Sequence, residues 1–286
     1  MTNKNILIIG GTGNLGKPVA NEFLNQGFNI KLFVRDIRKA KVNFNHPNIS
    51  YIEGDLKNLS SIKKALIGVH AVYLNLSLNY EEGKDGFHPE KQGLTNLLKL
   101  AKTFELDRIG YISSMFINND SNWWGFKIKR DAVDSIKKSG IPHLIFTPSL
   151  FMETITSEFK SGNKLLTNGD MGKAHYWISV KDYAKQVVRA YKENIKDREF
   201  YIQGPYPMTL TQALDEFSQN YKSEQLTVSK NSLGILKFKK VVSNKANIEF
   251  NIFDAINKLD EEFLSDKTWS ELGKPETDME NFAKNY

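Results

Sequence analysis

The sequence contains no cysteine and no long apolar run. The absence of cysteine excludes disulfides, thiol catalysis and cysteine-ligated zinc sites. A membrane-spanning helix needs about 20 mostly apolar residues, whereas the first apolar run covers only Ile6 to Ile9 and ends in glycines. That run is also too short for the apolar segment of a signal peptide. We therefore expect a cytoplasmic protein without membrane contact.

Clusters of charge are also missing. The 39 lysines and arginines exceed the 33 acidic residues by 6, and they are spread along the chain. This mild positive charge favours an anionic ligand and gives no reason to expect contact with nucleic acid. With 286 residues, 40% of them hydrophobic, the chain suits one large α/β domain with an appended lobe, or two closely joined domains.

Short β-rich runs alternate with helical patterns in the first half of the chain. The predicted strands are Asn5–Ile9, Asn29–Val34, Ile49–Glu53, Ala71–Leu76, Arg108–Ser113 and His143–Thr147. The predicted helices between them are Leu15–Asn25, Leu59–Leu66, Lys91–Phe104 and Phe126–Lys138. This alternation is typical of parallel strands joined by helical crossovers. We predict an α/β fold, a doubly wound parallel Rossmann sheet, over residues 1–150.

The pattern changes after Pro148. A helix is predicted near Val180–Glu193, a short strand at Glu199–Gln203 and another helix near Leu210–Tyr221. The tail from Lys222 to Tyr286 has a helical, amphipathic pattern. We expect residues 151–286 to form a smaller α/β C-terminal substrate lobe packed against the first domain.

A glycine-rich loop follows the first predicted strand and opens the first predicted helix. Its sequence is Gly10-Gly11-Thr12-Gly13-Asn14-Leu15-Gly16. We expect Gly10 to permit the tight turn, Gly13 to let the backbone approach a pyrophosphate, and Gly16 to permit close helix–sheet packing. The helix N-terminus would offer free N–H groups and a partial positive charge to the phosphates. The sequence thus predicts a dinucleotide site, with an ordinary glycine-rich turn as the alternative.

The end of the second predicted strand indicates which dinucleotide is bound. An acidic residue there binds the ribose 2′-hydroxyl of NAD, whereas an arginine accommodates the 2′-phosphate of NADP. This strand runs into Arg35 and then Asp36. The planar guanidinium suits a phosphate, and Lys39 is near enough to assist. We expect NADP(H) in preference to NAD(H); in the alternative, Asp36 binds the ribose and Arg35 is a solvated loop charge.

Further motifs, taken as a set, resemble one family. They are Ile8–Gly16, Phe33–Asp36 with Lys39-Ala40, Glu53–Leu56, Tyr111–Ser114, Ser139–Pro142, Thr147–Glu153 and Ile178–Ala184. In these motifs the chain resembles the NmrA-like atypical short-chain dehydrogenase/reductases, from residue 4 to about residue 190. The tail lies outside the resemblance.

This resemblance implies a Rossmann-type sheet, a preference for NADP(H), and a cleft between the sheet and the C-terminal lobe. The cofactor-binding residues that it implies are Gly10, Thr12, Gly13, Asn14, Leu15 and Gly16 in the loop, Arg35 and Lys39 for the 2′-phosphate, Asp55 and Leu56 beside the adenine, Asn75, Leu76 and Ser77 along the trough, and Ser113 and Lys129. Without the family argument, Gly54-Asp55 would also suit a simple turn.

The proton-donating tyrosine of typical short-chain reductases is absent. In those enzymes a tyrosine stands four residues before a lysine that lowers the tyrosine pKa and holds the nicotinamide ribose. Lys129 occupies the position of the lysine, and Gly125 occupies that of the tyrosine. Lys129 lies on the apolar stripe of its predicted helix, where an ammonium needs a polar partner such as a ribose hydroxyl. The alternative is a side chain that reaches solvent at the edge of the stripe.

Lys129 is therefore the one candidate catalytic residue. Spare proton donors with a weaker claim are Ser113, Ser114, His88 and Tyr176. Aromatic and apolar residues near the expected cleft form a predicted substrate pocket of Trp123, Trp124, Phe151, Met152 and Trp177. Such a pocket would suit a flat acceptor, although core packing between the lobes would use the same residues.

Two functions compete. The first is hydride transfer from NADP(H) to a small aromatic or quinone-like acceptor, a reaction in which the nicotinamide carries the chemistry and little acid catalysis is needed. The second is a non-catalytic NADP(H)-sensing regulator that binds a protein partner or a second copy of the chain, which the missing tyrosine favours. Epimerase or isomerase chemistry on nucleotide sugars needs the tyrosine and is the least expected. We expect no metal site.

Overall fold

The computed structural model describes residues 4–78, 82–118, 123–168, 172–231 and 244–286. Within them lies a seven-stranded sheet of order β10-β6-β5-β4-β1-β2-β3. Its strands are β1 (Asn5–Ile9), β2 (Asn29–Val34), β3 (Ile49–Glu53), β4 (Ala71–Leu74), β5 (Arg108–Ile112), β6 (His143–Pro148) and β10 (Arg198–Ile202). The pairs from β6 to β3 are all parallel. The predicted Rossmann sheet is confirmed.

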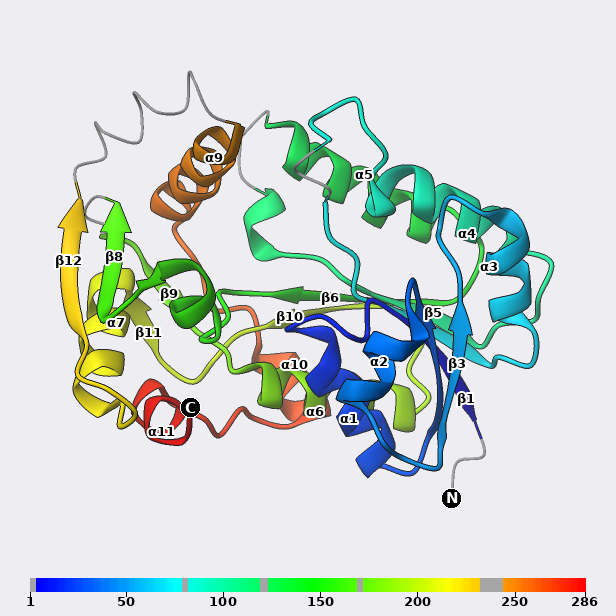
Figure 1. The fold of residues 1–286 in the computed structure, drawn as a ribbon, viewed down its shortest axis with the longest axis horizontal. Coiled ribbons are helices and arrows are strands. Elements are labelled where there is room, and N and C mark those ends of the chain that lie inside the picture. Colours follow the sequence, from blue (N-terminus) through cyan, green and yellow to red (C-terminus); the bar gives the residue numbers. More distant parts are fainter. Residues whose placement is uncertain (1–3, 79–81, 119–122, 169–171, 232–243) are drawn as a thin grey trace. The chain divides into compact units, whose positions relative to one another are not determined.

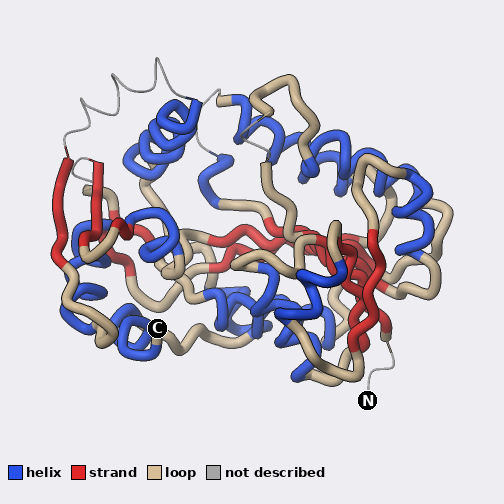
Figure 2. The backbone as a smooth tube through the Cα atoms, viewed as in Figure 1, coloured by secondary structure: helices blue, strands red, loops and turns tan. Residues whose placement is uncertain are grey.

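Helices cover both faces of this sheet (Figures 1 and 2). Helices α1 (Gly16–Asn25), α2 (Ile37–Asn43), α3 (Leu59–Leu66), α4 (Leu94–Ala101) and α5 (Trp124–Lys137) come between its strands, and α6 (Val180–Lys192) precedes β10. Helices α3, α4 and α5 lie on one face. On the other face, Phe23 of α1 packs edge-on against Tyr191 of α6, with ring centroids 5.0 Å apart. The sheet is thus wound on both sides, as predicted.

The core of the sheet follows from its apolar runs. Ile6, Leu7 and Ile8 of β1 are fully buried, as are Val72, Tyr73 and Leu74 of β4. Central parallel strands are covered on both faces and therefore consist of continuous apolar residues rather than alternating ones. The rigid, buried strands fix the positions of the loops at their carboxyl ends.

The chain divides into two compact units that interleave along the sequence. Unit 1 comprises residues 1–113, 124–147 and 184–200, and unit 2 comprises residues 114–123, 148–183 and 201–286. This division differs from a single boundary after residue 150, because 114–123 belongs with the later part and 184–200 belongs with the sheet. Arg108 shows why the latter segment joins unit 1: its guanidinium donates to the carbonyls of Ala190 and Ile195.

Unit 2 contains two small sheets and several helices. A three-stranded sheet joins β7 (Lys160–Ser161), β8 (Lys164–Asn168) and β12 (Thr227–Asn231), and β9 (Ala174–Tyr176) pairs with β11 (Pro207–Thr209). Its helices are α7 (Leu210–Asn220), α9 (Asn244–Lys258), α10 (Asp266–Leu272) and α11 (Met279–Asn285). Three short helical turns complete the described elements: η1 (Pro89–Gly93) in unit 1, and η2 (Met115–Asn118) and η3 (Ile155–Phe159) in unit 2.

The prediction of a helical tail from Lys222 to Tyr286 is wrong in part. Residues 227–231 form β12, which pairs in parallel with β8, and residues 259–265 are not helical. The second segment is fixed by a buried side chain: Glu261 accepts hydrogen bonds from Ser149 Oγ (2.7 Å) and Gln203 Nε2 (2.7 Å). Contacts with distant residues thus override the local helical pattern. No helix among the described residues is long and apolar enough to cross a membrane.

Candidate functional site

A pocket of about 500 Å³ lies in unit 1 at the carboxyl ends of β1 to β4. It is lined by Ile9, Gly10, Thr12, Phe33, Val34, Arg35, Gly54, Asp55, Leu56, Lys57, Asn75, Leu76, Ser77, Leu78, Glu82, Phe87 and Pro89. The strand order reverses between β1 and β4, and ligands of open α/β sheets bind at such a switch point. We call this the switch-point pocket.

The sequence predicted much of its lining. Gly10, Thr12, Arg35, Asp55, Leu56, Asn75, Leu76 and Ser77 line the switch-point pocket together. Other predicted cofactor residues are absent from the lining: Gly13, Asn14, Leu15, Gly16, Lys39, Ser113 and Lys129. The first four continue the glycine loop into α1, Lys39 is exposed on α2, and Ser113 directly follows β5.

Three glycines of the loop, Gly10, Gly13 and Gly16, differ in how closely the surrounding chain packs against them. Gly10 has φ +82°, and a Cβ added to it would lie 2.0 Å from the carbonyl oxygen of Asn75. A Cβ on Gly16 would lie 2.1 Å from the carbonyl oxygen of Gly10. A Cβ on Gly13 would meet nothing closer than 3.5 Å. Packing within the chain therefore requires the first and last glycine, whereas a Cβ at the middle one would make only ordinary van der Waals contacts.

The N-terminus of α1 fits an anion. Leu15 in the capping position makes no side-chain hydrogen bond to the helix, and the first turn contains no acidic residue. The first N–H groups of a helix lack intrahelical partners and carry a partial positive charge; in α1 the N–H of Lys17 donates to the Gly13 carbonyl of the loop at 2.9 Å. Asn75 supports the adjoining loop, because its Nδ2 donates to the Gly10 carbonyl at 3.3 Å. A phosphate group is the ligand that this arrangement suits.

Arg35 and Asp36 play distinct parts at the end of β2. Arg35 is exposed and lines the switch-point pocket, and within the described part of the chain its guanidinium has no hydrogen-bond or ion-pair partner. Asp36 caps α2, since its carboxylate accepts from the backbone N–H of Lys39 at 3.1 Å. A free guanidinium at the wall of a pocket suits an anionic group.

Other lining residues escaped the sequence analysis. They are Lys57, Glu82 and Phe87 from loops, and Pro89 at the start of η1. The backbone N–H of Phe87 donates to Glu82 Oε2 at 2.8 Å, and the Lys57 ammonium lies 4.9 Å from the Phe87 ring centre. Asp55 also has a turn role, because its Oδ1 accepts from the backbone N–H of Lys57 at 2.7 Å. These loops carry no periodic pattern that could reveal them.

Lys129 points into unit 1 and contacts a carboxylate. Its Nζ donates to Glu90 Oε1 at 2.6 Å, and the Tyr111 hydroxyl donates to the same oxygen at 2.7 Å. The side chain of Glu90 is fully buried, whereas that of Lys129 is 19% exposed. Burial, followed by the charge of Glu90, raises the pKa of Tyr111 well above its usual value. The sequence analysis expected a polar partner for Lys129, and within the structure that partner is Glu90. The Lys129 side chain has little exposure to solvent.

The spare proton donors have structural contacts. His88 is fully buried, its Nε2 lies 2.8 Å from the carbonyl oxygen of Gly83, and its ring packs against Trp124. Ser114 Oγ accepts from the backbone N–H of Phe116. Tyr176 packs against Phe263. Ser113 differs from these residues, because its buried Oγ has no hydrogen-bond partner among the described residues.

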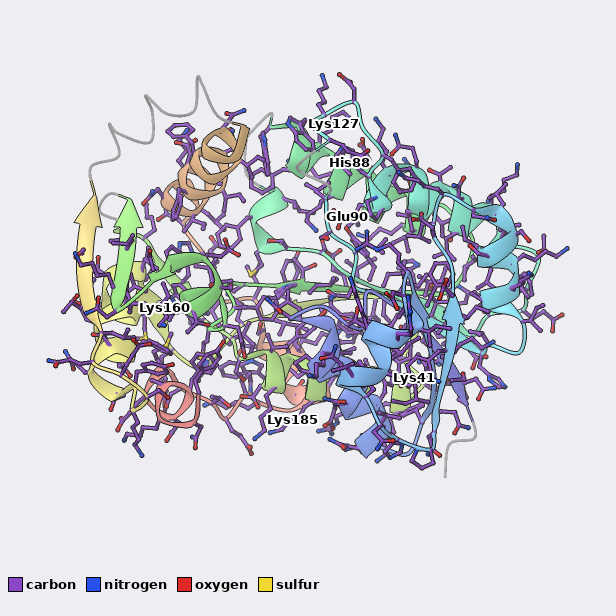
Figure 3. All side chains as sticks on the ribbon, viewed as in Figure 1. Lys41, His88, Glu90, Lys127, Lys160 and Lys185 are labelled. Atoms are coloured by element: carbon purple, nitrogen blue, oxygen red, sulfur yellow. The ribbon has the colours of Figure 1, made fainter. Side chains whose placement is uncertain are left out.

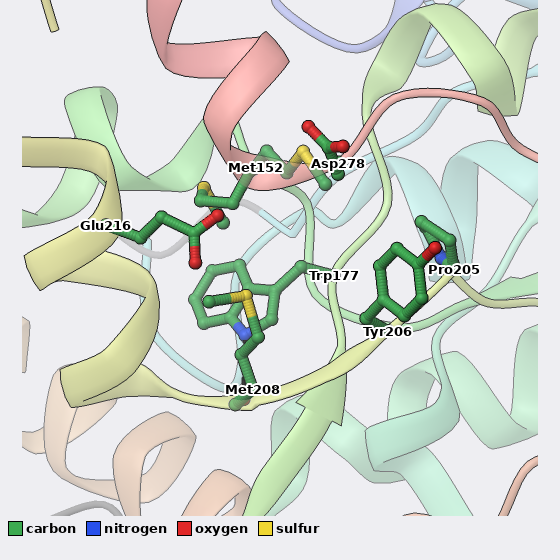
Figure 4. Close-up of a pocket in the computed structure, with 8 residues that line it drawn as sticks. Met152, Trp177, Pro205, Tyr206, Met208, Glu216 and Asp278 are labelled. Carbon is green, nitrogen blue, oxygen red and sulfur yellow. Dashed lines mark hydrogen bonds between the residues drawn. The ribbon is translucent and has the colours of Figure 1, made fainter. Parts of the chain in front are cut away.

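A second, apolar pocket of about 190 Å³ lies within unit 2 (Figure 4). It contains Met152 and Trp177 of the predicted substrate pocket, together with Pro205, Tyr206, Met208, Glu216, Asp278 and Met279. Phe151 packs edge-on against Tyr183 instead, Trp123 is buried, and Trp124 belongs to unit 1 beside His88. Met152 and Trp177 thus share this pocket, whereas its lining does not include Phe151, Trp123 or Trp124.

The class of protein follows from the switch-point pocket and from sequence comparison. A glycine loop, an uncapped helix N-terminus and a crevice where the strand order reverses define a dinucleotide-binding Rossmann protein. The family model described as NAD(P)H-binding matches residues 10–194. The chain belongs to this NAD(P)H-binding family.

Two curated relatives illustrate the range of the family. An uncharacterized chloroplastic protein of Arabidopsis thaliana is 27% identical over 163 residues, which is 51% of this chain and 58% of that protein. The photosystem II assembly factor Ycf39 of Trieres chinensis is 25% identical over 206 residues, or 70% of this chain and 63% of the relative. The chain thus spans less than two thirds of the length of these relatives.

Solved structures share the fold over nearly the whole chain. The NADPH-dependent quinone oxidoreductase QOR2 of Escherichia coli, complexed with NADPH, has a TM-score of 0.78 at 20% identity, covering 98% of this chain and 99% of that one. The triphenylmethane reductase of Citrobacter sp., complexed with NADP(H), has a TM-score of 0.77 at 19% identity, with coverage of 98% and 99%. A dTDP-glucose 4,6-dehydratase of Bacillus anthracis, in complex with NAD, has a TM-score of 0.71 at 13% identity, with coverage of 98% and 94%. These likenesses establish the fold.

Proposed function

We propose that this protein is an NADPH-dependent reductase that transfers hydride to a small aromatic or quinone-like acceptor. The choice of cofactor depends on the two residues that follow β2, Arg35 and Asp36. The Arg35 guanidinium faces the switch-point pocket without a partner among the described residues, while Asp36 is engaged as the cap of α2. Arg35 would bind the 2′-phosphate, whereas Asp36, the candidate for an NAD-binding acid, is absent from the pocket lining.

The residues present fit such a cofactor. The glycine loop at Gly13 and the start of α1 would receive the pyrophosphate, and Asp55 and Leu56 would lie beside the adenine. When bound, the nicotinamide supplies the hydride, so the chain has to orient both reactants and keep water away.

The missing tyrosine limits the choice of acceptor. Gly125 has no side chain with which to donate a proton, so acceptors that take up hydride without strong acid catalysis are favoured. Quinones and cationic dyes are of this kind. Two proteins with the same fold, QOR2 and triphenylmethane reductase, bear the names of such activities.

A direct assay tests this function. Purified protein is mixed with NADPH and a panel of quinones and triarylmethane dyes, and the absorbance of the reduced nicotinamide is followed. We expect turnover with at least one acceptor. If the protein binds NADPH but turns over no acceptor, the reductase proposal is contradicted.

A second function has an observation in its favour. The relative Ycf39 is named as a photosystem II assembly factor, and a protein that senses NADP(H) and binds a protein partner would not need the missing tyrosine. In that case NADPH binds without turnover and changes the affinity for the partner. Size-exclusion chromatography of the protein with and without NADPH would also show whether the partner is a second copy of this chain.

A further inference from the structure

We propose that Glu90 is the positioning residue for Lys129, because its buried carboxylate holds the Lys129 ammonium in place. This inference rests on the proposed function, because it concerns how the chain holds the nicotinamide end of the cofactor. Its central feature is the cluster of Glu90, Lys129 and Tyr111, which three different elements bring together.

The local backbone aims Glu90 inward. Glu90 is the second residue of η1 (Pro89–Gly93), a π-helical turn that leads directly into α4. Such turns insert an extra residue into a helix and are frequent at functional sites. Pro89 lines the switch-point pocket, and the next residue, Glu90, contacts Lys129. The single turn η1 therefore links the wall of the switch-point pocket to Lys129.

The burial of this carboxylate requires an explanation. The Glu90 side chain is fully buried, its Oε1 accepts from both Lys129 and Tyr111, and its Oε2 has no hydrogen-bond partner among the described residues. Taking an ion pair out of water is unfavourable, and apolar residues of similar size would fill the same space at least as stably. Packing alone thus does not account for Glu90, whereas a need to hold an ammonium in a fixed place does.

Lys129 is the member of the cluster that reaches a ligand. Its side chain is 19% exposed, against none for Glu90. Glu90 is its hydrogen-bond partner within the described part of the chain, and because an ammonium has three N–H donors, two remain available. Figure 3 shows Glu90 between the helices and the sheet, while Lys127 of the same helix as Lys129 lies on the outer side. We infer that the two remaining donors bind the hydroxyls of the nicotinamide ribose.

The test compares a whole cofactor with a fragment of it. NADPH and 2′,5′-ADP share the adenosine, the 2′-phosphate and a diphosphate or phosphate end, but the fragment has no nicotinamide ribose. Their dissociation constants are measured by calorimetry on wild type, Glu90→Gln and Tyr111→Phe, with NADH and ADP titrated in parallel. The amide of glutamine keeps the size of the side chain but removes its charge.

We expect Glu90→Gln to raise the Kd for NADPH roughly tenfold, as the loss of a charged hydrogen bond would, and to leave the Kd for 2′,5′-ADP unchanged. Tyr111→Phe should weaken NADPH binding in the same direction but by less. The matched control is Asp131→Asn, which removes the exposed Lys127–Asp131 pair of α5 (2.7 Å) and should change neither constant.

A structural role for Glu90 would give a different pattern. If Glu90→Gln weakens the binding of NADPH and of 2′,5′-ADP to the same extent, or weakens neither, the positioning role is overturned. If wild type binds neither dinucleotide, the proposed function itself fails, and that result is seen before any variant is compared.

Discussion

At the scale of single residues, the glycine loop separates the needs of the fold from those of a ligand. Gly10 adopts a positive φ and touches Asn75, and Gly16 touches Gly10, so both are explained by the chain itself. Gly13 has room for a side chain. The motif predicted a separate role for each glycine, and the close contacts that a Cβ would make at Gly10 and Gly16 agree with those roles, whereas the approach of a pyrophosphate to Gly13 stays a prediction.

This distinction gives a prediction for two alanine variants. Gly13→Ala should leave the melting temperature unchanged and weaken NADPH binding roughly tenfold, because the new methyl group would meet the pyrophosphate rather than the protein. Gly10→Ala should destabilise the protein by about 2 kcal/mol or more, since it adds a methyl group at a positive φ and against the Asn75 carbonyl. Thermal unfolding and calorimetry provide the two readouts. Equal losses of stability in both variants would contradict this account.

The residues of the candidate site differ in how far the sequence could predict them. Thr12 and Arg35 follow predicted strands and Asn75 lies near the end of one, and their place at the carboxyl ends is a consequence of the parallel sheet. Glu90 could not be predicted, because its partner Lys129 is 39 positions away and the contact depends on the π-helical turn. The sequence predicted that Lys129 needs a partner but did not identify it.

At the scale of elements, several boundaries agree with the prediction. Strands β1, β2 and β3 begin and end where the sequence predicted, although no residue of β3 is buried. Helix α2 was missed because only Ala40 of its seven residues is buried, so no apolar stripe marks it. Strands β7, β9 and β11 have two or three residues each, too few for a periodic pattern.

One element has a pH-sensitive end. Burial, together with the nearby Asp182, raises the pKa of Glu153 from its ordinary value to about 7, against the opposing hydrogen bonds that its carboxylate accepts from the backbone N–H of Val180 at the start of α6. The folded protein then holds a proton that the unfolded chain has already lost between pH 4.5 and about 7. The contribution of protonated Glu153 to the stability of the fold is therefore fully present below pH 4.5, and it is lost as the pH rises to about 7.

Glu153→Gln should therefore flatten the dependence of stability on pH. We expect the free energy of unfolding of wild type to fall by up to about 3 kcal/mol more than that of the variant between pH 4.5 and pH 8. Urea denaturation at several pH values measures this difference. Glu158→Gln, a change at an exposed residue of η3, is the control. Parallel pH curves for wild type and Glu153→Gln would show that Glu153 does not titrate in this range.

At the scale of the whole molecule, the sequence predicted the class of fold but not the division of the chain. The strand–helix alternation of the first half is a local pattern, and it leads directly to the Rossmann sheet. The interleaving of the two units is not local, because it arises where Arg108 binds the carbonyls of Ala190 and Ile195 and where Glu261 binds Ser149 and Gln203. Neither the composition nor the periodicity of the sequence predicts these long-range contacts.

The central claim concerns the whole molecule: the chain binds NADPH in the switch-point pocket, with the 2′-phosphate on Arg35. The most direct measurement is a calorimetric titration of wild type and Arg35→Ala with NADPH and with NADH. We predict that wild type binds NADPH more tightly, and that Arg35→Ala raises the Kd for NADPH roughly tenfold while leaving that for NADH unchanged. Equal affinity of wild type for the two cofactors, or an NADPH affinity that survives Arg35→Ala, would contradict the claim.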